Sequence, residues 1–83
     1  MRTAQAATIK RVKMDRLSGS RRFGTYDREK ITFYREALRR REKLRPVDVE
    51  NFADGLRIFD GYHRFRAHRL EGRKTILVRY MFA

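Results

Sequence analysis

The sequence predicts an α+β fold with one small mixed β-sheet and two main helices. Residues 27–43 repeat apolar side chains at helical spacing, residues 47–59 form two short apolar runs around a turn, and residues 75–82 are almost continuously β-branched or aromatic. These patterns indicate a helix, a hairpin and a buried strand. With a strand before them and a second helix after the hairpin, they give the element order of a compact α+β domain.

Length and composition set the class of protein. The chain has 83 residues and no cysteine, so we expect one domain over residues 8–83 without disulfides, thiolate metal sites or a cysteine nucleophile. Residues 1–7 lack turn chemistry and an apolar period, and we expect a flexible N-terminal arm there. The apolar runs are too short to span a membrane and no secretory signal is visible, which predicts a soluble, cytoplasmic protein without a membrane partner.

Charge is the strongest compositional signal. Twenty-two Lys and Arg residues against ten Asp and Glu residues give a formal net charge of +12, and a field of that sign attracts polyanions. Nucleic acid is therefore the first expected partner, and the excess of Arg over Lys favours bidentate contacts to phosphate or guanine. Two alternatives stay open: the charge serves only solubility, or the partner is an acidic protein.

The N-terminal half predicts a strand, a loop and a helix. Thr8–Met14 mixes β-branched and basic residues as a strand does, and residues 15–24 form a loop that carries Arg21 and Arg22. The helix is expected over Asp27–Lys43, since Asp27 can cap its start and an apolar stripe follows. Its basic outer face is a candidate contact surface for the nucleic-acid backbone, or simply a solvated face. The basic set is Arg35, Arg39, Arg40, Arg41, Lys43 and Arg45.

The C-terminal half predicts a hairpin, a helix and a strand. The hairpin strands are Val47–Phe52 and Leu56–Phe59, and the second helix covers Tyr62–Glu71, with Gly72 just past its end. Thr75–Phe82 is expected to be the most buried strand. Some apolar side chains are expected to pack in the interior, as core aromatics or on the apolar side of the second helix: Tyr26, Phe33, Phe52, Phe65, Leu70 and Tyr80.

The turn before the second helix outlines a phosphate site. A helix N-terminus offers unpaired N–H groups and the positive end of the dipole. Gly61 would let an anion approach the backbone, and Arg64 could fold back to hold phosphate oxygens bidentately. His63 could donate to the same phosphate, and Tyr62 could stack on a base or anchor the turn. The ordinary alternative is a structural glycine followed by a solvated arginine.

Two further polar residues near this turn are weighed for metal binding. Asp60 could hold a divalent cation beside a nucleotide, but an aspartate at such a turn more often caps the helix. His63 and His68 are five residues apart and do not share a helix face, so neither is expected to bind metal. No carboxylate pair or nucleophile with a base stands out, and enzymatic activity stays open.

Taken together, these segments resemble the ParB/sulfiredoxin superfamily from about Ile9 to Phe82. The matching residues are an arginine in the loop, a proline-led hairpin, the glycine turn and the last strand: Arg21 or Arg22, Pro46-Val47-Asp48-Val49, Asp60-Gly61-Tyr62-His63-Arg64 and Ile76-Leu77-Val78. The resemblance implies a ParB/sulfiredoxin-like mixed sheet whose Gly-x-x-Arg turn contacts nucleotide phosphates. It carries Gly61 and Arg64 over by position, together with one of Arg21 and Arg22.

The family also limits the expected chemistry. The sulfiredoxin cysteine falls on Tyr62, which excludes sulfur chemistry. Partition proteins continue into further domains where this chain stops, so a centromere-binding clamp is not expected. The leading hypothesis is a small basic nucleic-acid-associated module that binds phosphate, as nucleotide or DNA backbone, at the Gly-x-x-Arg turn, with a nucleoside triphosphate and Mg²⁺ as cofactor candidates. The alternatives are a Mg²⁺-dependent nuclease or nucleotide hydrolase, and a phage, plasmid or mobile-element protein that modulates a host protein.

Overall fold

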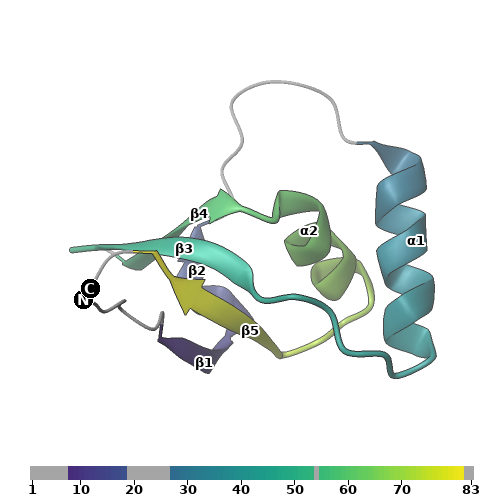
Figure 1. Ribbon diagram of the computed structural model, residues 1–83, viewed down its shortest axis with the longest axis horizontal. Helices are drawn as coiled ribbons and strands as arrows, with labels where there is room; N and C mark the ends of the chain where they lie inside the picture. Colours follow the sequence, from purple (N-terminus) through teal and green to yellow (C-terminus); the bar gives the residue numbers. More distant parts are fainter. Residues whose placement is uncertain (1–7, 19–26, 54, 82–83) are drawn as a thin grey trace, which may run out of the picture.

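The computed structural model describes residues 8–18, 27–53 and 55–81, and its architecture confirms the α+β prediction. These residues form a five-stranded mixed sheet in the order β1-β5-β3-β4-β2. Figure 1 shows α2 lying between this sheet and α1. The elements are β1 (Ile9–Lys13), β2 (Leu17–Ser18), α1 (Arg28–Arg39), β3 (Val47–Phe52), β4 (Gly55–Asp60), α2 (Tyr62–Leu70) and β5 (Thr75–Tyr80), with a 3₁₀ turn at Met14–Arg16.

The strand pairing makes the sheet mixed. β3 and β4 form the predicted antiparallel hairpin, β5 runs parallel to β3, and β1 is antiparallel to β5. The predicted loop over residues 15–24 was wrong at its start, because Leu17 and Ser18 form β2 beside β4. Leu17 is buried in the core, but a two-residue strand shows no periodicity from which it could be predicted.

The hydrophobic core lies where β3, β4 and β5 meet α2. Phe65 of α2 is fully buried among Val47, Val49, Ile76 and Val78, with Leu17 and Leu56 completing the cluster. β5 does not exceed β3 in burial, since only Ile76 and Val78 of β5 are buried while its other residues are half-buried. This alternation is typical of a strand with one face on the core.

Three of the expected packing side chains lie on the surface instead. Phe33, Phe52 and Leu70 are 60%, 41% and 41% exposed. Phe33 is two residues from the buried Ile31, a rotation of about 200° around the helix, which turns it away from α2. Phe52 packs beneath the Arg57 guanidinium, 4.1 Å from its ring centroid. Tyr80 does pack against the core, and Tyr26 lies outside the described residues.

Both helices end in the same hydrogen-bonded motif. In α2, Gly72 N donates to Arg69 O and Arg73 N donates to His68 O, with Gly72 at φ +70°, as in a Schellman cap. In α1, Arg41 N donates to Leu38 O and Glu42 N donates to Ala37 O. Arg41 holds the left-handed position at φ 63°, so α1 ends at Arg39, before the predicted Lys43.

A carboxylate clamps the two helices together. Glu71, just after α2, accepts hydrogen bonds from Arg35 at 2.6 Å and from Arg39 at 2.9 and 3.1 Å. These bonds, from Arg39 first and Arg35 second, lower the pKa of Glu71 from 4.5 to about 2.

Neither described helix is long and apolar enough to cross a membrane.

The clamp predicts a dependence of stability on pH. Because the folded-state pKa of Glu71 lies below its ordinary value, the ionised carboxylate stabilises the fold above pH 4.5, and this contribution is lost as the pH falls towards about 2. Glu71→Gln should therefore flatten the fall in unfolding free energy across that window in urea titrations. Glu36→Gln, which removes an exposed carboxylate from α1, serves as the control. Parallel curves for wild type and Glu71→Gln would contradict the clamp.

Candidate functional site

A cavity of about 380 Å³ opens at the N-terminal end of α2. Its size lies within the range of about 300–1,000 Å³ that is common for small-molecule sites. Residues from β4, from the α2 start and from α1 line it: Ile58, Phe59, Asp60, Gly61, Tyr62, His63, Arg64, Lys30 and Tyr34. The structure thus brings together Gly61, Tyr62, His63 and Arg64 of the predicted phosphate site. Arg21 and Arg22 lie outside the described residues.

Gly61 is required by the geometry of the turn. It precedes α2 with φ 102°, a backbone conformation that side chains rarely allow. A Cβ atom there would lie 2.8 Å from Nη2 of Arg64 and 3.3 Å from Cα of Val47. From the sequence we expected Gly61 to let a phosphate approach the backbone. In the structure, the space that a Cβ atom would occupy at Gly61 lies against the Arg64 guanidinium and the β3 backbone.

Arg64 folds back over the turn, so the solvated alternative does not hold for its side chain. Its Nη2 donates to the Pro46 carbonyl oxygen at 3.3 Å, and its Cζ lies 5.9 Å from the ring centroid of Tyr34. Its Nε is buried and has no hydrogen-bond partner among the described residues. A buried donor without an acceptor is unfavourable, so a side-chain shift that exposed this N–H to an anionic oxygen in the cavity would be favourable.

His63 connects the starts of the two helices beside the cavity. Its Nε2 accepts a hydrogen bond from the backbone N–H of Asp27 at 3.1 Å. Asp27 is the predicted cap of α1, and its Oδ1 accepts from Glu29 N and Lys30 N. In this arrangement Nε2 of His63 serves as an acceptor that holds α1 against α2, rather than as a donor to a phosphate.

The sequence favoured Asp60 as the cap of α2, but Asp60 bonds to the residue just before the helix. Its Oδ1 accepts from the N–H of Gly61 at 2.9 Å, whereas Gly61 itself occupies the cap position of α2. Asp60 therefore stabilises the glycine turn and not the first helical turn. Among the described residues, no group of three or more His, Asp or Glu side chains could hold a metal ion.

A buried ion pair lies under the same turn. Asp48, 7% exposed, accepts from Nε of Arg79 at 2.7 Å and from Nη2 at 3.1 Å. These bonds raise the pKa of Arg79, and Asp60 adds a smaller effect in the same direction. Asp48 pairs with Asp60 in the β3–β4 register. The ion pair thus fixes β3 beside the strand end from which the turn begins.

Sequence reasoning missed the contribution of α1 to this cavity. Lys30 and Tyr34 line it, and they are four residues apart, so they share one face of the helix. That spacing is visible in the sequence. Nothing in the sequence shows that this face meets the start of α2, because the approach of α1 depends on the helix–helix contact.

The structure does not bring the predicted basic set together on one surface. Arg35 and Arg39 are paired with Glu71, and Arg40 is paired with Glu42 at 2.8 Å. Arg41, Lys43 and Arg45 follow α1 and line a second, larger cavity of about 540 Å³. The basic set therefore divides into helix residues that form ion pairs and loop residues that line the second cavity.

Comparison with known proteins supplies a family and a fold. The chain matches the ParB N-terminal domain over residues 1–81. Among solved structures, sulfiredoxin from Arabidopsis thaliana has a TM-score of 0.75 at 22% identity, covering 92% of this chain and 86% of that one. The C-terminally truncated chromosome-partitioning protein ParB from Caulobacter crescentus, complexed with CTP-γ-S, has a TM-score of 0.73 at 22% identity, covering 92% and 45%.

A third structure extends the same likeness. A Pnob8-like ParB-N domain has a TM-score of 0.61 at 19% identity, covering 90% of this chain and 29% of that one. The chain thus spans less than half the length of both ParB-type chains. Identities this low make the likeness one of fold. No curated protein sequence matches the chain.

Proposed function

The chain belongs to the ParB N-terminal domain family, and on this premise we propose that it binds the phosphates of a nucleoside triphosphate in the cavity at the Gly61–Arg64 turn. The similarly folded ParB from Caulobacter crescentus was solved with CTP-γ-S, which makes a cytidine nucleotide the first ligand to test. As part of a strongly basic chain, this site would belong to a nucleic-acid-associated module.

The observation that carries the proposal is the position of Arg64. Its guanidinium lies against Gly61, lines the cavity and has a buried Nε that finds no acceptor in the described part of the chain. The cavity also lies at the N-terminal end of α2, where the helix dipole favours an anion. Lys30 adds a second cation from α1. Anionic oxygens in this cavity would thus find both the positive end of a helix and a pre-positioned arginine.

Mg²⁺ enters this proposal only with the nucleotide. Mg²⁺ in nucleotide sites usually keeps several waters and needs one or two carboxylates besides the phosphates. Asp60 is the one carboxylate among the described residues that line the cavity, and it would be the protein group nearest such an ion. Its Oδ1 already bonds to Gly61 N, which leaves the second carboxylate oxygen for this role.

The proposal is tested by calorimetric titration of CTP, ATP, GTP and UTP with and without Mg²⁺. We expect Arg64→Ala to weaken binding roughly ten- to a hundredfold, because it removes a charge-assisted contact of about 1.5–3 kcal/mol. Arg69→Ala removes the same charge from the exposed end of α2 and should change affinity less than twofold. Melting temperatures identify any loss of fold. Equal affinities for these two variants, or no nucleotide binding by the wild type, would overturn the proposal.

A further inference from the structure

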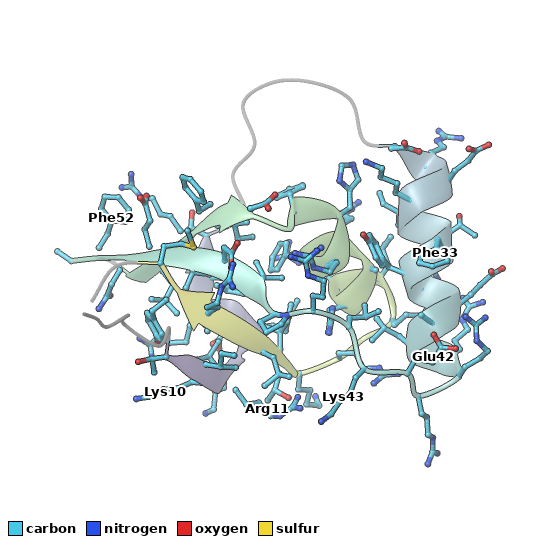
Figure 2. All side chains as sticks on the ribbon, viewed as in Figure 1. Lys10, Arg11, Phe33, Glu42, Lys43 and Phe52 are labelled. Atoms are coloured by element: carbon cyan, nitrogen blue, oxygen red, sulfur yellow. The ribbon has the colours of Figure 1, made fainter. Side chains whose placement is uncertain are left out.

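The second cavity concentrates positive charge at the opposite end of α2. It lies between β1, the segment after α1, and the segment that leads from α2 into β5. Figure 2 shows Arg11 and Lys43 next to each other at this site. Six exposed cations from these three segments line it: Arg11, Arg41, Lys43, Arg45, Arg73 and Lys74.

Very little negative charge compensates these cations. Glu42 is the one acidic residue in the described lining, and it is already paired with Arg40 at 2.8 Å. None of the six cations forms an ion pair with a described residue. Two of them are held in place by neutral acceptors: Arg73 Nη2 donates to Leu38 O at 2.7 Å, and Arg11 Nη1 donates to Thr75 Oγ1 at 3.3 Å.

The pKa of His68, which lines this cavity, is lowered by burial and by the nearby arginines. Its Nδ1 lies 2.7 Å from the Arg64 carbonyl oxygen and therefore donates to it. Burial lowers the pKa of His68, and the charges of Arg73, Arg11 and Arg64 lower it further. The hydrogen bond to the Arg64 carbonyl oxygen opposes these effects, and the net result is a pKa below the ordinary value.

Arg41 lines this cavity from a strained backbone position. It occupies the left-handed cap position at φ 63° that Gly72 fills after α2. Glycine is the usual residue there, since any Cβ is strained in that conformation. An arginine at this position sacrifices stability and places one more cation at the cavity, which is the pattern expected where strain serves binding.

We propose that this cavity binds the phosphodiester backbone of nucleic acid, independently of the nucleotide at the Gly61–Arg64 turn. A phosphate chain offers successive negative charges to cations that come from three segments, whereas a single nucleotide would reach only part of them. The described lining holds no Phe, Tyr or Trp side chain, and its one aromatic ring, the imidazole of His68, is half-buried and bonded to the Arg64 carbonyl oxygen. The cavity thus lacks the exposed aromatic platform on which bases stack in sequence-tolerant single-strand sites. Contact is therefore with the backbone, and binding should not depend on base sequence.

The test compares two triple variants that remove equal charge. Lys43→Ala, Arg45→Ala and Lys74→Ala together remove cations from the cavity; Arg16→Ala, Arg28→Ala and Arg69→Ala remove exposed cations elsewhere. Fluorescence anisotropy with a labelled duplex, at two salt concentrations, gives the affinity and its salt slope. We expect the cavity variant to bind at least tenfold more weakly, with the slope reduced by about 0.9 per lost contact. Its affinity for CTP should not change, which separates this site from the turn.

The proposal would be overturned by equal weakening in the control variant, by an unchanged salt slope, or by polyglutamate binding as tight as the duplex, which would favour an acidic protein partner. Scrambling the duplex sequence should leave affinity unchanged. Replacing the duplex with a single strand of the same length tells which form of backbone the cavity prefers. A two-fold or smaller difference between scrambled sequences supports contact with the backbone, and a large difference contradicts it.

Two further measurements distinguish binding from structure. Arg41→Gly should raise the melting temperature by about 4–8 °C, the shift expected for one relieved strained residue in a chain of this size, while weakening duplex binding. If the melting temperature and the duplex affinity both rose or both fell, the assigned role of Arg41 would be contradicted.

NMR titration of His68 should show its pKa rise when duplex is added, because bound phosphates offset the charges of Arg73 and Arg11. An unchanged pKa at saturation would place the duplex elsewhere.

Discussion

Gly61→Ala is expected to lower the free energy of unfolding by about 2–3 kcal/mol. Alanine would have to adopt the backbone conformation of Gly61, φ 102°, which residues with a Cβ atom rarely adopt. Its Cβ atom would also lie 2.8 Å from Arg64 Nη2 and 3.3 Å from Val47 Cα, and the β3 backbone cannot move aside without disturbing the core. The effect is measured by urea unfolding, with nucleotide affinity determined on the same samples.

Gly72→Ala supplies a matched control for this prediction. Gly72 also has a positive φ, 70°, but a Cβ there would meet nothing within 4 Å. Its replacement should cost only about 1 kcal/mol, the price of the left-handed conformation alone. Combining Gly61→Ala with Arg64→Ala should recover part of the loss, since the nearest clash is removed. If Gly61→Ala and Gly72→Ala cost the same, the crowding of Gly61 against Arg64 is not energetically significant.

Arg79→Met is expected to destabilise the fold by more than the loss of an exposed ion pair does, because it leaves the largely buried Asp48 carboxylate without its two hydrogen bonds. Asp48 is 7% exposed, so its carboxylate relies on this guanidinium for most of its hydrogen bonding, whereas the Arg79 side chain itself is 39% exposed. Replacing both partners, as Asp48→Val with Arg79→Met, should return most of the stability, since a well-packed apolar pair can substitute for a buried ion pair.

The exposed ion pair between Arg40 and Glu42 serves as the comparison. The two side chains lie 2.8 Å apart and are 54% and 53% exposed, so Arg40→Met should change the unfolding free energy by less than Arg79→Met does. Both variants are measured by urea unfolding at neutral pH. Equal effects for Arg79→Met and Arg40→Met would show that burial of Asp48 does not matter.

Much of the fold follows from local patterns in the sequence. The hairpin, the turn at Gly61 and the start of α2 at Tyr62 occur where turn residues and apolar runs place them. The end of α1 was misplaced because a non-glycine residue, Arg41, takes the left-handed position, and side-chain identity does not reveal this. The burial of Asp48 could not be predicted, because its partner Arg79 is 31 residues away in the sequence.

Only those parts of the candidate site that depend on local spacing could be predicted from the sequence. Gly61 and Arg64 are separated by one helical turn, so their proximity follows from helix geometry. Lys30 and Tyr34 reach the cavity only through the packing of α1 on α2. The second cavity combines β1 with two segments distant in sequence, and its cations come together only when β1 pairs with β5.

The central claim is that Arg64 and the glycine turn receive the phosphates of a nucleotide. The most direct test is a titration of the ¹⁵N-labelled protein with CTP-γ-S, followed by NMR for the backbone amides and for the Nε–H group of Arg64. We expect the largest amide shifts on residues 61–64, and we expect the Arg64 Nε–H signal to move downfield as its buried donor gains an acceptor. Shifts that centre on Arg73 and Lys74, or an Arg64 Nε–H signal that does not move at saturation, would contradict the central claim.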